Sequence, residues 1–207
     1  MKFFMGPHIW DETVEDIVAA GHERVDDLSQ ADVFVFTSSN PEDFPDKLPD
    51  NIQFVQHCFT GVEGLIDAGL ITEDGIPWAN TAGAFATPVA EMGLMLLLAQ
   101  AHRQKEVTRA ASFDVAGHAD RTQQWLYSNL HRGKKKLVIF GAGGIGKEFI
   151  RLIEPFDMEV IAVNRSGREV EGADQTVKMA DADALWETAD IVVLVLPLTE
   201  ETEGIVD

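Results

Sequence analysis

Hydrophobic residues in the first half of the chain occur in short runs separated by polar, glycine- and proline-rich segments. Runs at residues 2–5, 32–37 and 52–57 predict strands, and residues 13–20 predict a helix that ends at Gly21. Strands alternating with helices are typical of a parallel sheet covered on both faces. The first half therefore predicts an α/β domain.

A long helix follows. Thr87 and Pro88 predict its start, with a hydroxyl cap followed by proline at the first helical position. Apolar residues then fall at i, i+3, i+4 and i+7 and also on most remaining faces: Met92, Met95, Leu96, Ala99, Leu94, Leu97 and Leu98. Such a helix is expected to be buried between layers, domains or subunits. It continues through Arg103, where we place the boundary between a first domain, residues 1–103, and a second, residues 104–207.

The second half repeats the alternation of strands and helices. Strands are predicted at residues 135–140, 159–163, 176–179 and 190–196, and helices at residues 145–153 and 181–188. The order β-α-β-β-α-β predicts a second doubly wound parallel sheet.

The turn between the first strand and helix of this half has the pattern G-x-G-x-x-G. Gly141 permits a tight turn, Gly143 lets the backbone approach a diphosphate, and Gly146 lets the helix pack closely on the sheet. The amides near Gly144 and Ile145 then face the phosphates at the positive end of the helix dipole. The alternative is a glycine-rich turn without a ligand, but the strand, helix and second strand around it favour a dinucleotide site.

The end of the second strand distinguishes between the two nicotinamide dinucleotides. NAD sites usually place an acidic residue here, whereas this chain has Asn164, followed by Arg165, Ser166 and Arg168. Guanidinium groups match phosphate geometry, so we predict NADP(H), while NAD(H) stays possible. The alternative is a solvated turn with incidental cations.

Composition and charge narrow the class of protein. The net charge is −19, with three Lys and Arg against 17 Asp and Glu in residues 1–100, and 13 against 18 in residues 101–207. This acidity argues against a nucleic-acid partner and supports two domains, the second carrying more cations. Cys58 is the only cysteine, no secretion signal is found at the start, and the most apolar stretch, residues 92–99, is too short to span a bilayer. We expect a cytoplasmic protein without a membrane segment, and we identify no metal site.

The chain resembles the D-isomer-specific 2-hydroxyacid dehydrogenases, which include glyoxylate/hydroxypyruvate reductases and phosphoglycerate dehydrogenase. The motifs that carry the resemblance are, in order, Thr60-Gly61-Val62-Glu63, Val89-Ala90-Glu91 with Arg103, GAGGIG, DMEVIAVNRS, and Leu196-Pro197-Leu198-Thr199 with Thr202 and Gly204. The resemblance implies a flavodoxin-like substrate domain followed by a Rossmann domain that is incomplete at its carboxyl-terminal end. It implies hydride transfer between NADP(H) and a small 2-oxo acid in the cleft between these domains, giving a D-2-hydroxy acid.

The resemblance also implies roles for particular residues. The amides near Gly61 and Val62, with Thr60, would hold the substrate carboxylate. Thr87 and the segment formed by Leu196, Pro197 and Thr202 would line the nicotinamide and ribose end of the cofactor. The alternatives are a mere tight turn at Gly61 and a pure helix cap at Thr87. The long helix would help to form a homodimer.

Two departures from the family pattern remain. Glu63 stands where the family often has Asp, which we expect to matter little if backbone amides bind the substrate. The family's catalytic arginine, carboxylate and histidine are expected beyond Asp207, so we predict that the 207 residues alone are inactive. His57 ends a strand and is expected to be a satisfied core histidine; the other histidines lie in polar surroundings without a motif: His8, His22, His102, His118 and His131.

Two other interpretations stay open. One is a non-catalytic NAD(P)-binding regulatory module on the same fold. The other is a fragment with no function of its own.

Overall fold

The computed structural model describes residues 1–112, 126, 133–199 and 201–206, so His118 and His131 lie outside the described residues. The chain divides into two compact units, Met1–Gly83 and Ala84–Asp207. We describe each unit by itself.

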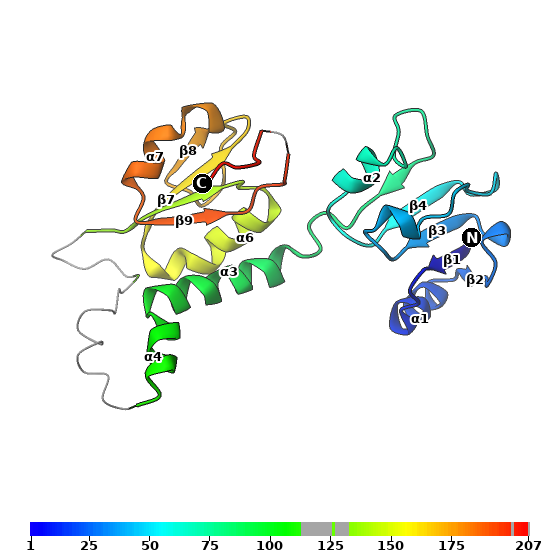
Figure 1. The fold of residues 1–207 in the computed structure, drawn as a ribbon, viewed down its shortest axis with the longest axis horizontal. Coiled ribbons are helices and arrows are strands. Elements are labelled where there is room, and N and C mark those ends of the chain that lie inside the picture. Colours follow the sequence, from blue (N-terminus) through cyan, green and yellow to red (C-terminus); the bar gives the residue numbers. More distant parts are fainter. Residues whose placement is uncertain (113–125, 127–132, 200, 207) are drawn as a thin grey trace. The chain divides into compact units, whose positions relative to one another are not determined.

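The first unit is built around a five-stranded parallel sheet. Its strands are β1 (Lys2–Gly6), β2 (Glu23–Arg24), β3 (Val33–Phe36), β4 (Phe54–His57) and β5 (Trp78–Ala79), its helices α1 (Asp11–Ala19) and α2 (Glu63–Asp67), with 3-10 turns at Leu28–Gln30 and Pro41–Asp43. The strand order is β2-β1-β3-β4-β5, and every pair is parallel (Figure 1). This is the flavodoxin-like order, which confirms the predicted fold of the first half.

Alternation along the strands directs apolar side chains to both faces of this sheet. Phe3 and Met5 of β1 pack with α1 on one face. Phe36 and Val55 pack with Leu65 of α2 on the other. The sequence pattern missed β2 and β5, because a two-residue edge strand is too short to show an alternation.

The second unit carries a four-stranded parallel sheet. Its elements are α3 (Ala86–Ala101), α4 (Gln104–Ala110), β6 (Lys136–Phe140), α6 (Gly144–Ile153), β7 (Glu159–Asn164), β8 (Gln175–Lys178), α7 (Asp183–Thr188) and β9 (Ile191–Leu194), with 3-10 turns at Glu154–Phe156 and Met179–Asp181. The order β8-β7-β6-β9 is the first part of the Rossmann order, in which the chain starts at the centre and returns to the other side. The predicted β-α-β-β-α-β succession is confirmed.

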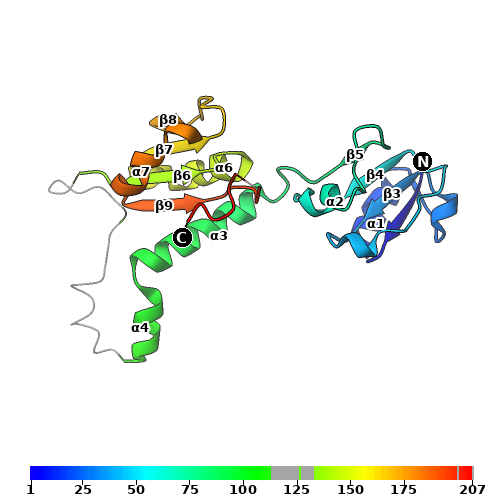
Figure 2. The same ribbon diagram turned by 45° about the horizontal axis from the view of Figure 1, so that its top comes forward.

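Helices cover both faces of this second sheet (Figure 2). Leu137 and Ile139 of β6 contribute to the core beneath α6 and α3. Val138 and Phe140 face the side of α7, where the ring of Trp186 stacks on that of Phe140 at a centroid distance of 4.1 Å. The central strand is therefore buried on both faces, which explains its continuous apolar run.

The start of α3 differs from the sequence prediction. The helix begins at Ala86, and its N-cap residue, Phe85, makes no side-chain capping bond. Thr87 therefore lies inside the first turn, and its hydroxyl donates to Glu148 Oε1 of α6 at 3.3 Å. The predicted hydroxyl cap at Thr87 is wrong, because this side chain is engaged by the neighbouring helix.

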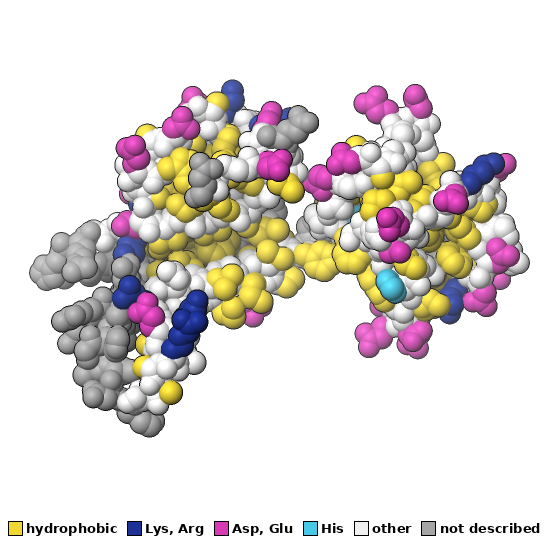
Figure 3. Space-filling model, viewed as in Figure 1, with side chains coloured by type: hydrophobic (Ala, Val, Ile, Leu, Met, Phe, Trp, Pro, Cys, Tyr) yellow, Lys and Arg dark blue, Asp and Glu magenta, His cyan; other side chains and the backbone are white. Residues whose placement is uncertain are grey.

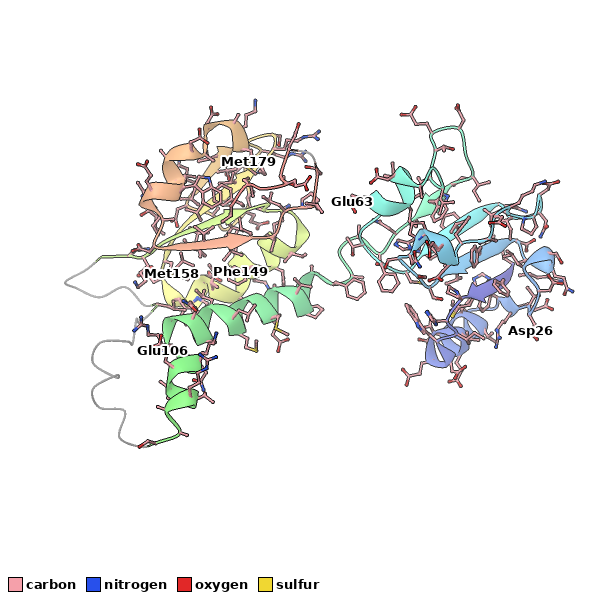
Figure 4. All side chains as sticks on the ribbon, in the orientation of Figure 1. Asp26, Glu63, Glu106, Phe149, Met158 and Met179 are labelled. Atoms are coloured by element: carbon pink, nitrogen blue, oxygen red, sulfur yellow. The ribbon has the colours of Figure 1, made fainter. Side chains whose placement is uncertain are left out.

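The faces of α3 are unequal. Phe149 of α6 (Figure 4) lies against Gly93, where an added Cβ would be 3.1 Å from a ring carbon. The Met92, Met95 and Leu96 side chains are 53%, 51% and 57% exposed. The periodic repeat thus identified the helix but not the face that is buried within this unit.

The close packing of α3 on α6 also bears on the division of the chain. α3 belongs to the second compact unit, whereas the sequence analysis assigned residues 1–103 to the first domain. The helix ends at Ala101, and Arg103 has a left-handed backbone (φ 47°) before α4 begins. The functional division at residue 103 stays a prediction.

Across the described residues, no helix combines the length and the apolar character that a membrane crossing requires.

Candidate functional site

Gly141 forms the exit from β6 and is required there for two reasons. Its φ of +92° is a conformation that other residues rarely adopt. An added Cβ would lie 2.5 Å from the carbonyl oxygen of Val195, which follows β9. The turn therefore lies against the backbone of the neighbouring strand, at the point where the strand order reverses and where open α/β sheets bind their ligands.

The other two motif glycines differ in what surrounds them. At Gly146 an added Cβ would be 3.3 Å from Gly141 O and 3.4 Å from Ile139 Cγ2, so this glycine brings α6 close to the sheet. At Gly143 the nearest atom would be Gly141 O at 3.9 Å. Packing among the described residues does not require a glycine at position 143, and this leaves space for a ligand that approaches the backbone.

The first turn of α6 presents backbone donors to this space. Gly143 is the N-cap, and its own amide bonds to Gly141 O at 2.6 Å. The amides of Gly144, Ile145 and Gly146 come next, and helix geometry gives such first-turn amides no partner inside the helix. Such amides and the positive end of the helix dipole suit an anion, and the diphosphate site stays a prediction.

The turn after β7 is held rigid by its own side chains. Asn164 Nδ2 donates to Arg168 O at 2.7 Å, and Asn164 Oδ1 accepts from the amide of Ser166 at 3.1 Å. Ser166 Oγ accepts from the amide of Arg168 at 3.2 Å. Gly167 completes the turn with φ +71°. Asn164 and Ser166 are thus used to shape the turn that presents Arg165 and Arg168.

The two arginines of this turn are exposed, and neither forms an ion pair with any residue in the described part of the chain. Two carboxylates, those of Glu169 and Glu201, line the same cavity as Arg165 and Arg168, and Glu169 is the one adjacent to this turn in sequence. Glu169 is not among the residues predicted from the sequence, and its carboxylate is chemically suited to accept from ribose hydroxyls.

These segments surround one cavity of about 560 Å³ within the second unit. Its lining comprises Gly141, Ala142, Gly143, Gly144, Lys147, Asn164, Arg165, Ser166, Arg168, Glu169, Val170, Met179, Val195, Leu196, Pro197, Thr199, Glu201 and Thr202. Its volume falls in the usual range of small-molecule and cofactor sites. Three separate sequence motifs therefore meet at the carboxyl ends of β6, β7 and β9.

Thr202 organises the third of these segments. Its hydroxyl donates to Pro197 O at 2.6 Å and accepts from the amide of Thr199 at 2.8 Å. These bonds hold Pro197, Thr199 and Thr202 together at the cavity. Three of the predicted cofactor residues, Ile145, Gly146 and Thr87, do not line it. The cofactor role of Thr87 stays a prediction.

The second candidate site is the loop of residues 58–62, which follows β4 in the first unit. Its first four carbonyls accept hydrogen bonds from outside the loop: Cys58 O from Thr81 Oγ1 (3.2 Å), Phe59 O from the Thr81 amide (3.2 Å), Thr60 O from Asn80 Nδ2 (2.7 Å), and Gly61 O from His57 Nε2 (3.0 Å). The Cys58 amide donates to Phe36 O at 3.1 Å and the Val62 amide to Glu63 Oε2 at 2.9 Å. The amides of Phe59, Thr60 and Gly61 have no protein partner among the described residues. Such an arrangement is suited to an anion.

His57 is fully buried, as expected for a core histidine, but only one of its two ring nitrogens has a hydrogen-bond partner in the part of the chain that the structure describes. Its Nδ1 has no hydrogen-bond partner among the described residues. Burial lowers the pKa of His57, and the bond to Gly61 O opposes this shift. The ring is therefore neutral near pH 7 and donates from Nε2 to the loop.

Comparison with known proteins agrees with this geometry. Residues 92–207 match the model of the D-isomer specific 2-hydroxyacid dehydrogenase NAD binding domain, and this match covers more than half of the chain. The chain belongs to the D-isomer specific 2-hydroxyacid dehydrogenase family.

Three similar proteins illustrate the extent of the relationship. An uncharacterised protein from the proB 3' region of Corynebacterium melassecola is 44% identical over the whole chain, which spans 66% of that protein. A hydroxypyruvate reductase of Thermotoga maritima is 32% identical over 76% of this chain and 48% of its own length. The crystal structure of an NADPH-dependent glyoxylate/hydroxypyruvate reductase from Sinorhizobium meliloti, in complex with NADP and sulfate, matches with a TM-score of 0.69 at 23% identity, over all of this chain and 65% of that one. The last comparison shows the shared fold.

Some residues of this 2-hydroxyacid dehydrogenase chain were not found from the sequence. Lys147 lines the cavity of the second unit. It directly follows the glycine motif near the start of α6, so its position in the sequence could have identified it. Asn80 and Thr81 hold the 58–62 loop from a segment about twenty residues away along the chain. The spacing of residues along the chain gives no indication that Asn80 and Thr81 contact this loop.

Proposed function

We propose that this chain provides the cofactor-binding and substrate-binding parts of an oxidoreductase that acts on NADP(H) and a small 2-oxo acid or D-2-hydroxy acid. In this proposal residues 1–103 serve the substrate and residues 104–207 serve the cofactor. The family membership supports the reaction class.

One observation carries the proposal. The glycine turn, the 164–168 turn and the 196–202 segment, which are distant in sequence, line a single cavity at the strand ends. Gly143 adds open space at the backbone where a diphosphate would lie. Amide donors and guanidinium groups suit the phosphates, and Leu196 and Pro197 suit an apolar ring.

Each group of residues has a defined task. The amides at Gly144 and Ile145 bind the diphosphate, and Arg165 with Arg168 binds the 2′-phosphate. The amides of Gly61 and Val62 bind the carboxylate of the substrate, with His57 and Asn80 fixing the loop. The bound dinucleotide supplies the hydride chemistry, while the protein supplies binding and orientation. We assign no proton-transferring group to the described residues.

The preference for NADP(H) over NAD(H) depends on Arg165 and Arg168, which have no ion-pair partner in the described part of the chain. Glu169 in the same cavity is the group that would favour NAD(H) instead. Direct titration of the protein with NADPH and with NADH distinguishes these two assignments.

The decisive experiment combines binding and turnover. The complete gene product is titrated with each reduced cofactor, and NADPH oxidation is then followed with glyoxylate, hydroxypyruvate and larger 2-oxo acids. We expect binding of NADPH and oxidation with at least one of these acids. Binding without turnover would favour a regulatory module, and absence of binding would refute the proposal.

We also propose a homodimer that uses α3. Hydrophobic side chains gather along this helix and beside β9 (Figure 3), and the groove between these two elements has a volume of about 670 Å³. Met92, Met95 and Leu96 expose apolar area that a second copy would cover. Sedimentation should show a dimer that Leu96→Lys weakens and that Val18→Lys leaves intact, since Val18 is also apolar and about half exposed but lies on α1.

A further inference from the structure

The 58–62 loop contains an anion of its own. Glu63 is an exposed residue at the start of α2 (Figure 4), and its Oε2 accepts from the amide of Val62 at 2.9 Å. The same oxygen lies 3.2 Å from the position of a Cβ added to Gly61. The carboxylate therefore folds back over the Gly61–Val62 peptide.

This contact occupies a donor that the proposed function gives to the substrate. The loop's carbonyls are already satisfied by His57, Asn80 and Thr81, so the amides are what the loop offers to a ligand. The Gly61 amide has no protein partner among the described residues. The Val62 amide has only the Glu63 carboxylate.

The length of Glu63 makes this contact possible. A glutamate carries its carboxylate one methylene farther than an aspartate, which lets it bend back to the amide of the preceding residue. Glutamate at this position was expected to matter little. The structure gives that difference a definite contact.

The hydrogen bond between Glu63 and the Val62 amide can be displaced by a ligand and does not block the loop permanently. Because Glu63 is exposed, water can solvate its carboxylate when it leaves the amide, and an exposed hydrogen bond has a small net free energy. A long side chain also loses rotamer freedom while it is held. An incoming carboxylate can therefore displace it, but must replace a bond that already exists and meet a like charge beside it.

We propose that Glu63 is a built-in competitor for the carboxylate of the substrate and so sets the affinity of the loop for small 2-oxo acids. This inference rests on the proposed function, because it assumes that the substrate carboxylate binds the amides of Gly61 and Val62. Removing the carboxylate of Glu63 should tighten binding, in contrast to the loss expected on mutating a residue that binds substrate.

The test uses oxamate, an unreactive analogue of a 2-oxo acid, and the ¹⁵N-labelled gene product. Amide resonances of Gly61 and Val62 report where oxamate binds, and their shifts give its Kd. Glu63→Ala removes the acceptor, and Glu63→Gln keeps its length with a neutral, weaker acceptor. Asp67→Asn removes the same charge from the other end of α2 and serves as the control.

We expect Glu63→Ala to bind oxamate about tenfold more tightly, the equivalent of about 1.4 kcal/mol. Glu63→Gln should gain less, because a charged acceptor binds an amide more strongly than a neutral one. Asp67→Asn should leave the Kd unchanged.

The contrary results are distinct. Unchanged affinity in Glu63→Ala, with oxamate still shifting both amides, would overturn the role of Glu63 and leave the substrate loop intact. An equal gain in oxamate affinity in Asp67→Asn would show that removing any nearby negative charge is sufficient. That result would also overturn the role of Glu63 as a hydrogen-bonding competitor. Oxamate that shifts neither amide in any variant would refute the substrate loop itself, and the inference with it.

Discussion

The two candidate sites are both glycine-containing turns at the end of a parallel strand, but they are held in different ways. At Gly141 the backbone conformation and the nearby Val195 carbonyl leave no room for a side chain. At Gly61 the φ angle is ordinary, and the nearest obstacle to a Cβ is the flexible end of Glu63. The cofactor turn is fixed by steric exclusion inside the sheet. The substrate loop is fixed by hydrogen bonds from side chains.

This difference has a physical consequence. A turn packed against the backbone of a neighbouring strand cannot move without disturbing the sheet, so the cofactor site should be as stable as the core around it. A loop held by individual hydrogen bonds, each of about 1 kcal/mol, can adjust at little cost. We therefore expect substitutions at the first site to change folding and substitutions at the second to change substrate affinity.

The largest expected effect is that of Gly141→Ala. The substitution introduces both a disfavoured φ and a contact of 2.5 Å with Val195 O, so it should lower the free energy of unfolding by more than about 3 kcal/mol. Urea unfolding followed by circular dichroism measures the change. NADPH binding should be lost with it.

Gly133→Ala is the matched control in the same unit. Gly133 also has a positive φ, +72°, but no atom of the described residues lies within 4 Å of an added Cβ. Gly133→Ala should lower the free energy of unfolding by about 1–2 kcal/mol, the cost of the backbone strain alone. Equal losses for the two variants would mean that contact with the β9 segment does not stabilise the cofactor turn.

Arg165→Ala should have the next largest effect, and on ligand binding alone. Loss of one charge-assisted pair to an exposed phosphate should raise the Kd of NADPH about tenfold, while that of NADH changes little. Fluorescence titration with each cofactor measures both constants. Arg109→Ala removes the same charge from α4, outside the cavity, and should leave both unchanged. Equal weakening of NADPH and NADH by Arg165→Ala would refute the NADP assignment.

The same contrast explains how much was predictable from the sequence. The glycine turn depends on residues spaced within one strand–turn–helix unit, so the sequence alone predicted that GAGGIG and the 164–168 segment follow β6 and β7, where the structure has them lining one cavity. The buried face of α3 could not be predicted in this way, because the surface of α6 decides whether Met92 or Gly93 points inward. The cap at Thr87 failed for the same reason, since Glu148 belongs to another helix.

The substrate loop was located only by resemblance to the family, and its support was not predicted. Asn80 and Thr81 reach the loop because β5 pairs beside β4, and β5 is too short to leave a sequence pattern. His57 was expected in the core, but its bond to Gly61 O depends on how the loop turns back over the strand end.

His57→Phe tests this support directly. Phenylalanine can keep the ring contacts with Phe36 and Phe59 but cannot donate to Gly61 O. We expect the KM for the 2-oxo acid to rise about three- to tenfold, the value of one net hydrogen bond, while the KM for NADPH stays constant. His57→Gln retains a donor and should recover part of the loss. An equal rise in both KM values would mean that the substitution disturbs more than the loop.

The smallest effect is the dependence of stability on pH. Burial lowers the pKa of His57 in the folded protein, so below the unfolded value of about 6.5 the unfolded chain takes up a proton that the folded chain resists. The free energy of unfolding should therefore fall as the pH falls from about 6.5 to the lowered pKa of the folded state, with a slope of at most about 1.4 kcal/mol per pH unit. Comparison of the wild type with His57→Gln at each pH removes the contribution of other titrating groups. Identical slopes would show that His57 is protonated as readily in the folded chain as in the unfolded one, which a ring enclosed between Phe36 and Phe59 does not allow.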